Sequence, residues 1–195
     1  MRDQQQTPRV AVIGKGASEL ASDLGVEVHA LESSDVALFI VSATDGIVRA
    51  DSDLWLQARE SYIPSVVVIS DLTAKNELDF EDMTAIASKM LDPVATPYLV
   101  LHDEESAPVA LIDLLTLRIR DYSQTTVTER AADPEHGEIV AEFAEEYKEN
   151  LEAAGEDGFQ QGLLYPALPW VTENKLGLAE ILSYIHSVDV IPSAG

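Results

Sequence analysis

Two short polar stretches each follow a predicted strand and carry side chains that could contact a ligand. Gly14–Gly16 ends the strand predicted over residues 9–13, and Ser70–Thr73 follows the apolar run of residues 66–69. That run, Val-Val-Val-Ile, has no polar face, which is typical of a strand covered by helices on both sides. In α/β sheets the ligand crevice lies at the carboxyl ends of the strands. We therefore expect one crevice to be bordered by Gly14, Lys15, Gly16, Ser70, Asp71 and Thr73.

The turn Gly14-Lys15-Gly16 can attract an anion, because backbone N–H groups at a helix start carry partial positive charge. It also allows a dinucleotide-binding interpretation, in which Glu32 would bind ribose hydroxyls. However, Glu19 stands where that motif needs its third glycine, and the helix predicted over residues 17–24 is about half the usual length. A glycine turn that starts a shortened helix is the favoured interpretation.

The sequence contains no set of residues with the spacing of a catalytic or metal centre. Ser42 and Ser70 follow strands, but neither lies in the G-x-S-x-G turn of a nucleophilic serine. The four histidines are scattered without metal-ligand spacing. Cysteine is absent, which excludes disulfides and cysteine-based zinc or redox sites. We predict no catalytic residue and no metal site.

The charge balance is strongly acidic, with 35 Asp and Glu against 12 Lys and Arg and a formal net charge of -23. Nucleic-acid affinity comes largely from basic side chains that neutralise phosphates, so we expect no direct nucleic-acid partner. Acidity that serves solubility is the simplest explanation. An acidic mimic of nucleic acid, which occupies a basic groove of another protein, is a sharper alternative.

The length and hydropathy of the chain predict a globular protein without a membrane partner. Hydrophobic residues make up 46% of 195 residues, enough for one sizeable core. No run approaches the roughly 18 apolar residues of a membrane span. The start, MRDQQQTPRV, lacks the apolar segment of a signal peptide. We therefore expect a cytoplasmic location.

Hydrophobic patterning predicts strands that alternate with helices, which implies a doubly wound, mostly parallel sheet with helices on both faces. Residues 26–31 fit a second strand or an extended connection, 108–120 a strand or a mixed hairpin arm, and 124–135 a loop. The other strands are predicted over residues 9–13, 36–41, 66–69, 96–101 and 163–168, and the helices over 17–24, 51–62, 79–91, 137–154 and 178–188.

From about Ser33 onward, the order of these pieces resembles the GTP-binding domain of translation elongation factor G. The run SSDVALFIVSATDGIVRADSDLWLQARESYIPSVVVISDLT is similar to the middle of that domain. TPYLVLHDEESAPVALIDLLTLRIRDYS and the acidic helix after it look like the insertion that this family carries. The ending LYPALPWVTENKLGLAEILSYIHSVDV is similar to the last strand, loop and helix. The resemblance implies a P-loop GTPase type of fold with a small α+β insertion.

None of the family's nucleotide motifs is intact. Its phosphate loop needs a long glycine-rich turn and a Ser or Thr for Mg²⁺, whereas here the strand runs directly into Gly14 and neither residue type directly follows Lys15. Only eleven residues separate Leu24 from Val36, too few for the two switch segments. We therefore expect neither GTP, GDP nor Mg²⁺ to bind.

The base-reading motif N-K-x-D is replaced as well. In the alignment that the resemblance implies, Ser70 stands for the Asn, Asp71 for the Lys and Thr73 for the Asp. Thr73 cannot supply the two charged acceptors that hold guanine. After the last strand, Trp170 either fills the vacated base pocket or simply packs in the core.

These observations predict a single domain over residues 1–195 with an insertion subdomain at 96–160. Its expected function is that of a pseudo-GTPase-like domain, in which the six crevice residues are vestigial and the role is protein–protein interaction or regulation. One alternative is an enzyme that binds a small molecule or nucleotide in the crevice around Gly14, Thr44, Asp45, Ser70 and Asp71. The acidic mimic is another.

Overall fold

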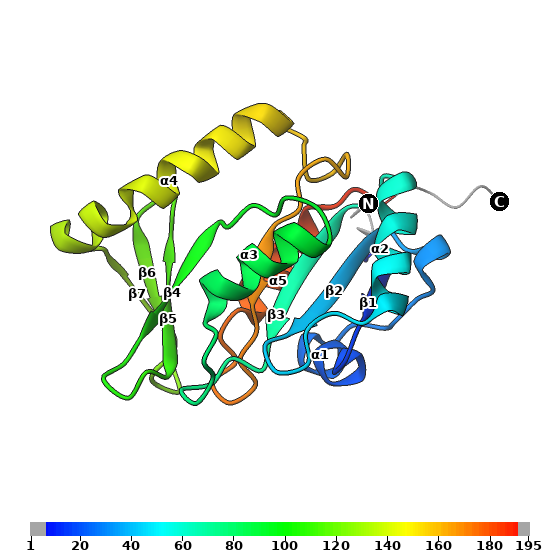
Figure 1. Cartoon of the computed structure of the whole chain (residues 1–195). Coiled ribbons are helices and arrows are strands. Elements are labelled where there is room, and N and C mark those ends of the chain that lie inside the picture. Colours follow the sequence, from blue (N-terminus) through cyan, green and yellow to red (C-terminus); the bar gives the residue numbers. More distant parts are fainter. Residues whose placement is uncertain (1–6, 191–195) are drawn as a thin grey trace, which may run out of the picture.

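A computed structural model describes residues 7–190 of the chain, which fold into two four-stranded sheets with five α-helices (Figure 1). The first residues of the sequence, on which the expectation of no signal peptide partly rests, lie outside the described part, as do the last five. Within residues 7–190, no helix is both long enough and apolar enough to cross a membrane.

The first sheet is parallel and contains β1 (Val10–Ile13), β2 (Val36–Ser42), β3 (Ser65–Ser70) and β8 (Ala167–Pro169), in that spatial order. Every residue of β2 and β3 is buried, as the uninterrupted apolar runs predict. The predicted mixed α/β fold with a parallel sheet is confirmed. β8 is shorter than the strand predicted over residues 163–168, and Pro169 fits there because β8 lies at the edge of the sheet.

Helices cover both faces of this sheet. The even-numbered residues of β2, such as Leu38, pack with α1 (Ala17–Leu24) and α5 (Leu178–Ser187). The odd-numbered residues, such as Phe39, pack with α2 (Arg49–Glu60) and α3 (Phe80–Met90). This division follows from strand geometry, since successive side chains point to opposite faces. Two hydrophobic cores therefore hold the strands from both sides.

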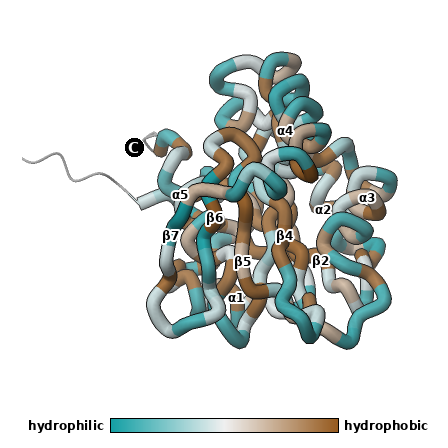
Figure 2. The backbone as a smooth tube through the Cα atoms, turned by 90° about the vertical axis from the view of Figure 1, so that its left-hand side faces the viewer, coloured by the Kyte–Doolittle hydropathy of each residue, from teal (hydrophilic) through white to brown (hydrophobic). Residues whose placement is uncertain are grey.

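The second sheet is antiparallel, with β4 (Tyr98–His102), β5 (Pro108–Asp113), β6 (Arg118–Asp121) and β7 (Thr128–Ala131) in sequence order. The long helix α4 (Pro134–Ala154) follows it and lies along one end of this sheet (Figure 1). Figure 2 shows β4 and β5 largely in the hydrophobic colour, while the stretch along β6 and β7 is more hydrophilic. β4 and β5 therefore supply most of the buried apolar residues of this sheet.

A buried ion pair connects the two sheets. Glu180 of α5 is fully buried, and its carboxylate accepts hydrogen bonds from Arg120 Nη1 at 2.8 Å and from the Tyr122 hydroxyl at 2.8 and 2.9 Å. Asn174 Nδ2 also donates to the backbone oxygen of Pro108 at 2.9 Å. The partners in these contacts lie about sixty residues apart in the sequence. Their hydrogen bonds hold β5 and β6 against α5 and the loop before it, which belong to the parallel sheet's side of the molecule.

Two local predictions differ from the structure, and one open alternative is decided by it. The loop predicted over residues 124–135 is wrong, because β7 forms within it and α4 begins at Pro134. β7 has no apolar face to reveal it, and it exists through backbone pairing with β6. The helical spacing of apolar residues in α4 predicts that Ile139 and Phe143 lie on its buried face, but they are 71% and 40% exposed. Residues 26–31 form an extended connection with one bridge, Val10 to Val28, followed by the 3₁₀ turn η1 (Leu31–Ser33).

Candidate functional site

The carboxyl ends of β1, β2 and β3 bring three short loops together, as the sequence predicts for a parallel sheet. Ile13 pairs with Phe39, and Ser42 pairs with Ser70, so these strands end at the same edge. The loops that follow carry Lys15, Asp45 and Asp71, whose side chains join in one hydrogen-bonded group. We call this group the strand-end cluster, and its members are Lys15, Ser42, Thr44, Asp45 and Asp71.

The turn after β1 requires glycine for a steric reason. Gly14 has φ of 113°, and a Cβ atom at this position would lie 2.7 Å from the backbone oxygen of Ile40. The chain then enters α1 directly, since the N–H of Ala17 donates to the Gly14 oxygen at 3.3 Å. Gly16, at φ of 87°, precedes the first residue of α1. The turn thus passes close to the backbone of β2 at Ile40 and leads directly into a helix start.

Lys15 is neutralised by a carboxylate of the protein itself. Its ammonium group donates to Asp45 Oδ2. This hydrogen bond is the main reason why the pKa of Lys15 is raised and the pKa of Asp45 is lowered; hydrogen bonds from Thr44 and Ser42 contribute further to Asp45. The charge of Lys15 is therefore paired before any ligand arrives.

Ser42 is the centre of the strand-end cluster. Its buried hydroxyl accepts hydrogen bonds from the N–H groups of Thr44 at 3.2 Å and Asp45 at 3.1 Å. It donates its single hydrogen to Asp71 Oδ2. The Thr44 hydroxyl bridges the carboxylates, at 3.0 Å from Asp45 Oδ2 and 3.4 Å from Asp71 Oδ2. Two carboxylates and one ammonium group leave the cluster with net negative charge.

The remaining predicted crevice residues take structural roles. Ser70 is buried, and its backbone oxygen accepts a hydrogen bond from Ala43 at 3.0 Å, which joins β3 to the loop after β2. Thr73 lies apart from the cluster and donates to Asn76 Oδ1 at 2.9 Å. Asn76 also donates to the backbone oxygen of Asp71, whose φ of 58° is left-handed. Residues 71–76 therefore form a loop held by its own hydrogen bonds.

Trp170 packs beneath the turn after β1. It is 3% exposed, belongs to the same core as Leu20 and Ile181, and has ring carbons 3.4 and 3.7 Å from where a Gly16 Cβ would lie. Its Nε1 has no hydrogen-bond partner among residues 7–190. The indole ring therefore fills the space below Gly16, which is the core-packing placement foreseen for it.

Glu32 does not reach the crevice. It lies in η1, before β2, and accepts a hydrogen bond from Gln57 Nε2 of α2 at 3.2 Å. Because β1 and β2 run parallel, Glu32 is at the amino ends of the strands, the opposite edge from Gly14. A ligand held at Gly14 cannot also contact Glu32, so the geometry opposes the dinucleotide interpretation.

The described residues also offer little for a metal ion. Within residues 7–190 there is no group of three or more His, Cys, Asp or Glu side chains placed to hold one. Asp45 and Asp71 are only two carboxylates, and Lys15 already occupies one of them. A mainly polar hollow of about 340 Å³ lies at the loop after β3, lined by Thr73, Asn76 and His102 among others, but no member of the strand-end cluster lines it.

Comparisons with known proteins agree with the family resemblance at a coarse level. No protein-family model matches the chain. Proteins described as elongation factor G-like, from the CDC 1551 and H37Rv strains of Mycobacterium tuberculosis, are 25% identical over 176 residues. These alignments cover 78% of this chain and 24% of each relative, so the chain spans about a quarter of their length.

A crystal structure of a Thermus thermophilus protein has the same fold. It matches with a TM-score of 0.68 and 24% sequence identity, over 83% of this chain and 27% of that one. The predicted resemblance to elongation factor G is thus confirmed as similarity to an elongation factor G-like protein.

Proposed function

We propose that this chain is a degenerate GTPase-like domain of elongation factor G type that has lost the binding of GTP, GDP and Mg²⁺. The observation that carries the proposal is the ion pair between Lys15 and Asp45. In a phosphate-binding loop the lysine reaches the β- and γ-phosphates. Here the ammonium group is paired with a carboxylate, and Asp71 adds a second negative charge beside it. Such a cluster repels a polyphosphate.

The elements around the crevice support the same proposal. The turn from β1 to α1 is too short to wrap a phosphate group, because α1 begins at Ala17, directly after Gly14-Lys15-Gly16. Between α1 and β2 the chain forms only an extended connection and η1, so the family's two switch segments have no counterpart there. Thr73 is held by Asn76 at the position from which guanine would be read.

We propose further that the domain acts through protein contacts, in interaction or regulation. In this proposal, the second sheet and α4 form the insertion at residues 96–160. α4 exposes Ile139 and Phe143 on a helix rich in glutamate. These two side chains lie one turn apart on α4, and apolar side chains that are grouped and rimmed by polar residues are typical of a contact site. The net charge of -23 favours a protein partner over nucleic acid or an anionic membrane.

Thermal unfolding in the presence of nucleotides tests the loss of binding. A ligand at 100 times its dissociation constant stabilises a protein by about 2.7 kcal/mol, which shifts the Tm of a chain of this size by roughly 5–10 °C. With GTP or GDP and Mg²⁺ at millimolar concentration, we expect a Tm within about 1 °C of the free protein.

Two results would contradict this expectation in different ways. Stabilisation by GTP or GDP that depends on Mg²⁺ would show a working nucleotide site and overturn the proposal. Stabilisation by ATP or NAD without an effect of guanine nucleotides would instead favour the alternative of an enzyme that uses the same crevice. An Asp45→Asn variant is the informative control, because it releases Lys15 from its carboxylate and makes the cluster less negative.

A further inference from the structure

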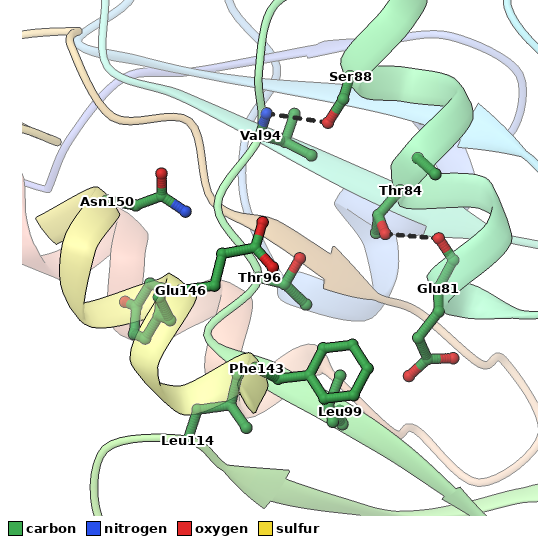
Figure 3. Close-up of a pocket in the computed structure, with 12 residues that line it drawn as sticks. Glu81, Thr84, Ser88, Val94, Thr96, Leu99, Leu114, Phe143, Glu146 and Asn150 are labelled. Atoms are coloured by element: carbon green, nitrogen blue, oxygen red, sulfur yellow. Dashed lines mark hydrogen bonds between the residues drawn. The ribbon is translucent and has the colours of Figure 1, made fainter. Parts of the chain in front are cut away.

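A cleft of about 180 Å³ lies between α3 and α4, where the second sheet meets the first (Figure 3). Its walls come from α3, the connection to β4, the start of β4, the residue after β5 and α4. None of the residues of the strand-end cluster lines it. The cleft is therefore a separate feature, and binding of a ligand there does not depend on the loss of nucleotide binding at the sheet edge.

One side of the cleft is apolar. Leu99 of β4 and Leu114 after β5 form its floor, and the half-exposed ring of Phe143 reaches into it from α4 (Figure 3). These side chains can cover a short aliphatic chain. The volume is well below the roughly 300–1,000 Å³ of sites for drug-sized ligands, which excludes a nucleotide but admits a single long side chain or a small amine.

On the polar side of the cleft, two hydroxyl groups already make local hydrogen bonds, whereas two carboxylates have no ion-pair partner. The Thr84 hydroxyl donates to the backbone oxygen of Glu81 at 2.8 Å, and Ser88 Oγ accepts from the N–H of Val94 at 3.1 Å, so both serve the local structure. The carboxylates of Glu81 and Glu146 form no ion pair with any described residue. Figure 3 shows the Glu146 carboxylate extending from α4 toward Thr96.

No positively charged side chain of the cleft balances the negative charge of Glu81 and Glu146. None of its lining residues is Lys or Arg. Burial is the main reason why the pKa of Glu81 is raised, and the nearby carboxylates of Asp79 and Asp82 act in the same direction, whereas backbone hydrogen bonds from Glu81 itself and from Val100 lower it. A positive group placed beside Glu81 would relieve this unfavourable burial of charge. The glutamates of α4 outside the cleft add to the negative potential: Glu135, Glu138, Glu142, Glu145, Glu149 and Glu152.

We propose that this cleft binds an alkylammonium group, with the aliphatic chain against Leu99, Leu114 and Phe143 and the ammonium between Glu81 and Glu146. An ammonium group supplies three donors for these carboxylates and for the hydroxyl of Thr96. The half-exposed Phe143 ring adds a favourable face for a cation. A free diamine and a lysine side chain of a partner protein share this chemistry, and both are tested below.

Amide chemical shifts from ¹⁵N-labelled protein, titrated with 1,5-diaminopentane at physiological ionic strength, test the proposal. We expect saturable shifts confined to α3, β4 and α4, and none with the neutral 1,5-pentanediol. The peptide acetyl-Ala-Lys-Ala-amide is titrated in parallel, with norleucine in place of lysine as its control. Cleft shifts with the peptide alone would identify a protein lysine as the ligand, and shifts with the diamine alone a free amine.

Variants separate the cleft from general attraction to an acidic surface. Glu81→Gln/Glu146→Gln is expected to weaken binding at least about tenfold, because both charge-assisted hydrogen bonds are lost. Glu138→Gln/Glu152→Gln removes the same charge from exposed positions of α4 outside the cleft and should change binding less than about threefold. Glu146→Gln alone should also weaken binding, since this exposed side chain forms no ion pair with any described residue that the substitution could disturb.

Three results would overturn the proposal. The first is the absence of cleft shifts with both probes. The second is a set of shifts spread over the acidic surface that does not saturate. The third is an equal loss of affinity in the cleft variant and in the control variant.

Discussion

At the scale of single residues, polar side chains at the sheet edge bind each other. Lys15 pairs with Asp45, and Ser42 links Asp45 and Asp71 through one buried hydroxyl. The sequence predicts that these residues meet, because each follows a parallel strand. Their pairing was not predictable, since it depends on rotamers and on the left-handed backbone at Asp71. Ser42 occupies the centre because it is the last residue of β2, directly beside β3.

Asp35 offers a test of one buried carboxylate at the other edge of the sheet. Its side chain is 2% exposed and accepts hydrogen bonds from Arg9 Nε at 3.0 Å, Nη2 at 2.7 Å and the backbone N–H at 2.8 Å. The hydrogen bond from the Arg9 side chain is the main reason why the pKa of Asp35 is lowered. Its stabilising effect is therefore complete above its unfolded-state pKa of about 3.9 and is lost as pH falls through the lower folded-state value.

We expect Asp35→Asn to be less stable than the natural protein near pH 7, and this difference to shrink as the pH falls below about 4. Urea unfolding over that pH range measures the difference. Asp53→Asn, which removes an exposed carboxylate of α2, should show little difference at any pH. A stability difference for Asp35→Asn that does not change with pH would contradict this account of the ion pair.

At the scale of elements, helices and buried strands follow from the sequence, and the second sheet does so only in part. α1 matches its prediction because Gly16 and Gly25 mark its ends, and β2 and β3 match because continuous apolar runs leave them no solvent face. β7 escaped prediction because all four of its residues are exposed, so no alternation of polar and apolar residues remains. β7 forms because its backbone pairs with β6, and this pairing leaves no signal in the types of its residues.

The contact between α5 and β6 holds the second sheet against the first and can be tested by mutation. Glu180→Gln keeps the shape of the side chain but removes the charge that Arg120 and Tyr122 contact. We expect a loss of about 3 kcal/mol in the free energy of unfolding, the lower end for a buried ion pair, because Arg120 is 39% exposed and can be solvated. Chemical denaturation measures the loss, and hydrogen exchange should increase first in β6 and β7.

Glu173→Gln serves as the matched control for this prediction. It removes the same charge from an exposed position in the loop before α5 and should cost less than about 0.5 kcal/mol. Equal stability of Glu180→Gln and Glu173→Gln would mean that the ion pair does not hold the sheets together. Arg120→Met in a double-mutant cycle with Glu180→Gln would measure the interaction between the two residues directly.

At the scale of the whole molecule, the net charge of -23 acts on stability as well as on the choice of partner. Only a few of the carboxylates are paired with Lys or Arg in residues 7–190. Repulsion among the others opposes the compact state, because folding brings like charges closer together. Salt shortens the range of this repulsion from about 10 Å at 0.1 M to about 3 Å at 1 M.

We therefore expect NaCl to raise the Tm by at least about 3 °C between 0.1 and 1 M, which is roughly 1 kcal/mol for a chain of this size. Scanning calorimetry or circular dichroism measures the change. Glu138→Lys/Glu152→Lys, which makes α4 less acidic at two exposed positions, should respond less to salt. A Tm that stays constant or falls with added salt would show that charge repulsion is not an important term.

By itself, the sequence determined the positions of the buried strands and most helices, the parallel sheet, the meeting of three loops at its edge and the similarity to an elongation factor G-like protein. These features depend on short-range patterns of apolar, glycine and proline residues, which can be read locally. Only the tertiary structure decided that Lys15 pairs with Asp45, that Arg120 contacts Glu180 and that Glu81 and Glu146 line one cleft. Those pairs lie 30, 60 and 65 residues apart. The first is set by the loops after β1 and β2, and the other two depend on how the second sheet packs against the first.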